Sequence, residues 1–248
     1  MCGENGFEKR LIKKNSMAYN QYGNSFQRTT PVVLNLIIAN VVVFIAQNLF
    51  GGMARDNSVN DLFALHHYGS DKFKIYQIIT HMFMHGGFMH LLFNMFGLWM
   101  FGTMIERIWG PKRFLIFYFV CGIGAALAQL GSYAYEYNMY DKMPMSLELL
   151  NNYQERLRVT ATLGASGAIM GIFAAFGYLF PNTEMIIFPV PIPVKAKWAI
   201  LGIIVIDLFS GVAGREGDNV AHFAHLGGAV TGFLIVFFQN RMDKKTFY

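Results

Sequence analysis

The chain has 248 residues, of which 54% are hydrophobic and only 14% are charged. Soluble domains carry about 25% charged residues, so this composition argues against an ordinary soluble globular protein. The net charge is +5, and its distribution along the chain is more informative than its sum. Cys2 lies in a polar segment and Cys121 in an apolar run, a pattern that predicts neither a disulfide framework nor a thiol site.

Six apolar runs have the length and composition of membrane spans, although the fourth and fifth are short. A spanning backbone must satisfy its own hydrogen bonds, so we expect helices. The predicted fold is an all-α, polytopic six-span bundle over 31–240, with a basic cytoplasmic tail at 1–30 and a short one at 241–248. The runs are Val32–Leu49, Phe88–Ile105, Phe114–Tyr133, Leu163–Phe180, Ala196–Gly211 and Val220–Gln239.

The basic residues predict the orientation of these spans. With the N-terminus in the cytoplasm, 13 of the 20 basic residues fall on the cytoplasmic side, and nine of the 15 acids fall on the other. This positive-inside bias predicts a multi-pass protein of the plasma or inner membrane with both termini cytoplasmic. The basic tail is a solvated orientation signal or a contact for anionic lipid. No cleavable signal peptide is evident, and Met17 is an alternative start that would make residues 1–16 incidental.

Two long loops lie on the outer side, at about 50–87 and 134–162. The first has the mixed polar and apolar composition of a segment that folds against the membrane. The second predicts a short surface helix around Leu147–Leu157. On the cytoplasmic side, Pro189, Pro191 and Pro193 exclude a regular helix.

All seven histidines fall on the outer side of this topology, which random scatter would not usually produce. Polar side chains at membrane depth are costly, and they are candidates for function. The histidines are His66, His67, His81, His85, His90, His222 and His225.

Ser166 and His225 are candidates for a nucleophile and its base. Ser166 lies in GASG near the outer end of the fourth run, and His225 shares a helical face with small residues. A serine hydroxyl is weakly nucleophilic until a base takes its proton, and histidine titrates in the right range. A packing face of small residues, with an interhelical hydrogen bond from the histidine, explains the same pattern.

His90 and Asn94 are four residues apart and therefore lie on one face of the second span. Each can donate a hydrogen bond, and two donors aimed at one point can hold the oxyanion of a tetrahedral intermediate. The alternative is a polar pair that joins two helices.

Taken together, these motifs resemble the rhomboid family of intramembrane serine proteases. They are HMFMHGGFMHLLFN at 81–94, GASG at 164–167 and AHLGGAVTG at 224–232, with Glu106-Arg107 and Gly110 ending the second span. Their order, spacing and placement match the family over about residues 30–240.

The resemblance implies a serine–histidine dyad without an aspartate, with Ser166 as nucleophile and His225 as general base. His90 and Asn94 match the oxyanion positions, joined by the Ser166 N–H. His85, His81 and Met170 match supporting positions, with no metal and no cofactor. It also implies that the first outer loop is embedded in the membrane and that the fifth span is a substrate gate.

The carboxylate Asp207, in the fifth span, is interpreted as structural, with no acid placed to complete a triad. His222 is expected to point elsewhere, toward the interface. Where many family members have Trp-Arg, this chain has Tyr76-Gln77, a change that predicts looser anchoring of the first outer loop. Four residues after Ser166, where family members often have an aromatic residue stacked on the catalytic histidine, this chain has Met170.

Three other functions fit parts of the pattern. His81, His85 and His90 have spacings compatible with zinc, although no carboxylate joins them. A non-catalytic relative that binds membrane clients would usually lack the serine or the histidine, and both are present. A transporter would show paired broken helices, which this sequence lacks. The expected partners are transmembrane protein substrates and membrane lipids, without nucleic acid; no pattern indicates an oligomeric state.

Overall fold

The computed structural model describes residues 30–51, 58–142, 144, 146–186, 192–213 and 221–243. Several predictions concern residues outside these ranges. They are the tail at 1–29 with Cys2 and Met17, the end of the C-terminal tail at 244–248, and Pro189 and Pro191.

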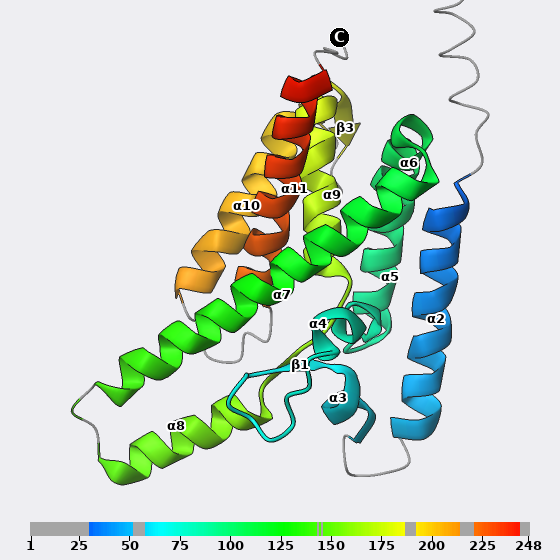
Figure 1. Ribbon diagram of the computed structural model, residues 1–248. Helices are drawn as coiled ribbons and strands as arrows, with labels where there is room; N and C mark the ends of the chain where they lie inside the picture. The colour runs from blue at the N-terminus through cyan, green and yellow to red at the C-terminus, as the bar shows by residue number, and fades with distance from the viewer. Residues whose placement is uncertain are drawn as a thin grey trace, which may run out of the picture.

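The principal helices follow the six predicted apolar runs (Figure 1). The second run is one rod with a π-helical turn in its middle, so three consecutive elements form it. The elements are α2 (Pro31–Gly51), α5 (Phe88–Gly97), η2 (Leu98–Gly102), α6 (Thr103–Trp109), α7 (Pro111–Asp141), α9 (Ser166–Leu179), α10 (Ala196–Ala213) and α11 (His222–Asp243).

Within the described ranges, four helices are long and apolar enough to cross a membrane. They are Pro31–Phe50, Phe88–Trp109, Pro111–Met139 and His222–Arg241. Helix α9 is apolar but has only 14 residues, or about 21 Å at 1.5 Å per residue. A hydrocarbon core is about 30 Å thick. The chain is therefore a multi-pass membrane protein, and the count of six spans stays a prediction.

Helix α2 shows the sidedness of a helix that faces lipid. Leu34, Ile38 and Ile45 expose 56%, 51% and 52% of their surfaces, whereas Asn40 is fully buried. The Asn40 amide donates to the Leu36 carbonyl oxygen. Such a large exposed apolar surface is costly in water, and it is the expected surface of a membrane span.

The Glu106 carboxylate caps the N-terminus of α2. It accepts the backbone N–H groups of Val32 and Val33 at 3.0 and 2.8 Å. These groups have no partner within the helix, because the first turn of any helix leaves its N–H groups free. Pro31 begins the helix, where its missing N–H costs nothing. The acidic residue of the Glu106-Arg107 pair thus joins α6 to α2.

Short elements cover the end of the bundle where α2 ends and α11 begins (Figure 1). The predicted surface helix is confirmed as α8, which is longer than expected. Helix α7 continues to Asp141, so the loop predicted from 134 begins later. Strand β1 pairs antiparallel with β2, with Leu65 opposite Thr162. The elements are α3 (Ser58–Phe63), β1 (Leu65–His66), α4 (Gln77–Thr80), η1 (His81–Phe83), α8 (Leu147–Val159) and β2 (Ala161–Thr162).

At the opposite end of the bundle, the proline-containing segment is flanked by two strands. Strand β3 (Glu184–Ile186) pairs antiparallel with β4 (Pro193–Lys195), and Ile186 lies opposite Pro193. Pro193 therefore lies in a strand and outside any helix, in agreement with the prediction that the prolines exclude a regular helix, and α10 begins directly after β4.

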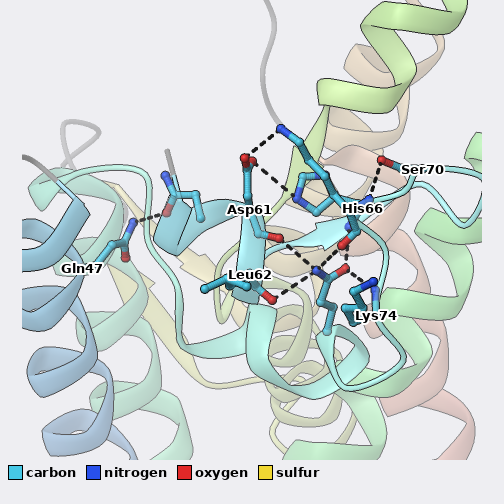
Figure 2. Close-up of polar contacts among 9 residues, drawn as sticks. Gln47, Asp61, Leu62, His66, Ser70 and Lys74 are labelled. Carbon is cyan, nitrogen blue, oxygen red and sulfur yellow. Dashed lines mark hydrogen bonds and ion pairs between the residues drawn. The ribbon is translucent and has the colours of Figure 1, made fainter. Parts of the chain in front are cut away.

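The buried amide of Gln77 ties the predicted first outer loop together, and looser anchoring than a Trp-Arg pair would give stays a prediction. Its oxygen accepts the N–H groups of His66 and Lys74 at 3.3 and 3.2 Å. Its nitrogen lies 2.9 to 3.2 Å from three backbone carbonyl oxygens, those of Asp61, Leu62 and Lys72. Figure 2 shows the polar contacts of this region. One fully buried glutamine thus bonds to five backbone groups of the loop.

Candidate active site

Ser166 is the first residue of α9, and the chain reaches it through an unusual turn. Gly164 has a φ of +124°, a conformation that L side chains rarely adopt. Its N–H donates to the His81 carbonyl oxygen at 2.9 Å. Just upstream, Thr162 pairs with β1, and its Oγ1 lies 2.8 Å from the Tyr133 hydroxyl. These contacts hold the segment that presents Ser166.

His225 lies in the first turn of α11, and its Nε2 is 2.7 Å from the Ser166 Oγ. The two helices approach closely because glycines face each other. An added Cβ at Gly228 would overlap the Gly167 carbonyl group, and one at Gly232 would overlap the Gly171 backbone. The small residues of both motifs therefore bring the hydroxyl and the imidazole together.

Asp207 of α10 also contacts His225, which corrects the prediction that no acid is placed to complete a triad. The His225 Nδ1 lies 3.1 Å from Oδ2 and 3.2 Å from Oδ1 of Asp207. An ionised carboxylate only accepts hydrogen bonds, so Nδ1 carries the hydrogen. The Nε2 of neutral His225 is then left to accept the Ser166 hydroxyl proton.

The prediction that His222 points toward the interface is wrong, because His222 contacts Asp207 in the site. Its Nδ1 lies 2.6 Å from the Asp207 Oδ1, and its side chain is 12% exposed. His222 and His225 are three residues apart, so they share a face of α11. The sequence signal for this cluster was Asp207 itself, the carboxylate within an apolar run, because intramembrane charges usually have polar partners.

The His90 ring and the Ser166 hydroxyl both lie beside Gly164. A Cβ added at Gly164 would lie 2.9 Å from the His90 Nε2 and 3.5 Å from the Ser166 Oγ. The His90 Nδ1 accepts the Gly86 N–H at 3.4 Å. In the neutral ring this acceptor role places the hydrogen on Nε2, which faces the site.

Two further groups are candidate donors. Asn94 is 7% exposed, and its amide nitrogen has no hydrogen-bond partner among the described residues. Asn94 lies one turn after His90 on α5. The Ser166 N–H belongs to the first turn of α9, where the N–H groups lack partners within the helix and attract negative charge.

His81 and His85 lie behind these donors. The His81 Nδ1 contacts the Gln77 carbonyl oxygen at 2.9 Å, and its own carbonyl oxygen accepts the Gly164 N–H. The ring centroid of His85 is 5.2 Å from that of His90, in an edge-on arrangement. Gln47 of α2 bonds to both backbone groups of His85. His81 thus contacts the turn that precedes Ser166, and His85 contacts the ring of His90.

Met170 lies one turn after Ser166, within a small apolar cluster. It packs with Ala174 of α9 and Ala229 of α11, beside Phe173 and Ile204. Its stacking on His225 stays a prediction. Among the described residues, no group of three or more His, Cys, Asp or Glu side chains is arranged to hold a metal ion.

Comparison with known proteins gives a consistent picture. A family model described as the Rhomboid domain matches residues 72–241. The mitochondrial Rhomboid protein 1 of Saccharomyces cerevisiae is 32% identical over 169 residues, which are 68% of this chain and 43% of the yeast protein. The mitochondrial RHOMBOID-like protein 12 of Arabidopsis thaliana is 32% identical over 201 residues, which are 80% of this chain and 55% of that protein.

Rhomboid protease AarA of Providencia stuartii is 28% identical over 213 residues, which are 82% of this chain and 70% of that protein. The chain therefore spans about half the length of the yeast and Arabidopsis relatives.

Proposed function

The chain belongs to the rhomboid family, and we propose from this premise that it is an intramembrane serine endopeptidase. The observation that carries the proposal is the 2.7 Å contact between the Ser166 Oγ and the His225 Nε2. A relative named as a rhomboid protease, AarA, supports the same activity. The substrate class we propose is single-span transmembrane proteins.

Ser166 and His225 carry the acyl transfer. His225 takes the hydroxyl proton as Ser166 attacks the carbonyl carbon of the scissile peptide bond, which gives a tetrahedral oxyanion. The intermediate then collapses, the C–N bond breaks, and His225 gives its proton to the leaving amine. Water, deprotonated by His225, hydrolyses the acyl-enzyme and restores the serine.

Three donors are proposed to hold the oxyanion. They are the Nε2–H of His90, the Asn94 amide and the Ser166 backbone N–H. The unpartnered Asn94 nitrogen and the position of His90 beside Gly164 support this assignment. Removal of one such donor typically lowers kcat by about 10²–10³-fold. We assign His81, His85 and Met170 to supporting roles.

The distribution of basic residues supports the proposed membrane setting. We propose six spans, with α9 and α10 as the two short ones, and cytoplasmic termini in a plasma or inner membrane. Ser166 begins α9 and His225 lies in the first turn of α11, at the end of the bundle where α3 and α4 lie (Figure 1). Cleavage would then fall near the outer face.

The test co-expresses wild type and Ser166→Ala with tagged single-span proteins and maps the cut site. We expect cleavage by wild type, none by Ser166→Ala or His225→Ala, and labelling of wild type by a fluorophosphonate at Ser166. Cleavage by Ser166→Ala would refute the proposal. Wild-type activity that EDTA abolishes would indicate a metal enzyme instead.

A further inference from the structure

The Asp207 carboxylate joins α10 to both histidines at the start of α11. Its Oδ1 lies 2.6 Å from the His222 Nδ1, and the His225 Nδ1 lies 3.1 to 3.2 Å from its two oxygens. The side chain is only 14% exposed. A partly buried carboxylate with two imidazole partners has a strongly restricted orientation, because charge-assisted hydrogen bonds are short and directional.

We propose that Asp207 is a positioning residue for His225, so that the site works as a serine–histidine–aspartate triad rather than as a dyad. The inference rests on the proposed function, and it deepens the account of the same site. Asp207 holds the His225 hydrogen on Nδ1 and keeps Nε2 toward Ser166. It also lies beside the positive imidazolium that forms when His225 takes the serine proton.

His222 holds the carboxylate in this orientation. The His222 Nδ1 makes the shortest contact of the cluster, with the Asp207 Oδ1, and the Asp207 Oδ2 is then directed at the His225 ring. The hydroxyl comes from α9, the base from α11 and the carboxylate from α10, and these helices lie side by side in Figure 1. Among the described residues, Ser166 and Asp207 contact His225 directly, His222 contacts it through Asp207, and His90 of α5 interacts with it electrostatically.

The alternative is that Asp207 only fastens α10 to α11. Ile200 provides the control, since it is 4% exposed and packs α10 into the core opposite Gly177. Ile200→Ala loosens α10 without touching the histidines. A purely structural role predicts equal kinetic losses in Ile200→Ala and Asp207→Asn.

The experiment measures kcat and KM for cleavage of a single-span substrate by the full chain in liposomes. We expect Asp207→Asn to lower kcat by at least about 100-fold with KM nearly unchanged, because the amide can favour the wrong histidine tautomer. Asp207→Glu should recover part of that loss, since it keeps the charge. His222→Ala should lose less than Asp207→Asn, because Asp207 still contacts His225. Fluorophosphonate labelling of Ser166 should slow in the same order.

The outcomes separate this inference from the proposed function. If wild type cleaves and Ser166→Ala does not, but Asp207→Asn keeps a kcat within threefold of wild type, Asp207 is not a positioning residue. A loss in Ile200→Ala that matches Asp207→Asn also overturns it, as does an Asp207→Glu variant no faster than Asp207→Asn. Cleavage by Ser166→Ala would overturn the proposed function itself.

Discussion

Replacing Gln77 tests what anchors the loop between α2 and α5. Its amide oxygen accepts two backbone N–H groups, and its two N–H hydrogens are shared among three carbonyl oxygens. Gln77→Leu keeps a similar side-chain volume and removes every one of these bonds. Because Gln77 is fully buried, water does not readily replace the amide.

The expected loss follows from the number of bonds. Two acceptor and two donor interactions at about 1 kcal/mol each give about 4 kcal/mol in the free energy of opening the loop. At about 1.4 kcal/mol per factor of ten, local opening should become about a thousandfold more frequent. The measurable loss in the free energy of opening cannot exceed the free energy of unfolding of the whole bundle, because a larger loss would unfold the variant globally.

Hydrogen–deuterium exchange of the full chain in nanodiscs measures this opening directly. We expect the amides between residues 61 and 77 to exchange about a thousandfold faster in Gln77→Leu. Ile75→Ala is the control, because Ile75 is 72% exposed and neighbours the same segment. Exchange in Gln77→Leu within tenfold of the Ile75→Ala rate would refute the reasoning.

Two further predictions concern the site and the loop. Gly164→Ala should lower the rate of the proposed cleavage at least about 100-fold, because the added Cβ strains a left-handed backbone and meets His90. Gly131→Ala is the control and should retain activity, because its added Cβ meets open space. Near-normal cleavage by Gly164→Ala would contradict the placement of the oxyanion. Burial lowers the pKa of His67, so its contribution to loop stability is complete above the ordinary value of about 6.5 and is lost as the pH falls toward the depressed value. Melting temperatures between pH 7.5 and 5 should therefore fall more in wild type than in His67→Phe, and equal falls would contradict the shift.

Motifs within one helix are predictable from sequence, whereas contacts between helices, other than the Ser166–His225 pair, are not. His90 and Asn94 share a face because of their i,i+4 spacing, and the surface helix α8 follows from its composition. Asp207 and His222 are 15 residues apart, on helices whose relative rotation no spacing specifies. The contacts of Gln77 are not predictable for a similar reason, because its five partners lie in two separate stretches of the loop, at 61–66 and 72–74.

The position of Ser166 depends on the loop as much as on its own helix. Helix α9 has only 14 residues. In the proposed six-span arrangement, the extended segment before it would lie at a depth where unsatisfied backbone groups are costly in lipid. Strand β1 pairs with that segment, and the His81 carbonyl oxygen accepts the Gly164 N–H. His81 directly follows α4, and Gln77 is the first residue of that helix. In that arrangement the loop would supply these hydrogen bonds and let a short helix begin below the membrane surface. An opening of the loop in Gln77→Leu should accordingly slow the proposed cleavage, although Gln77 touches neither Ser166 nor His225.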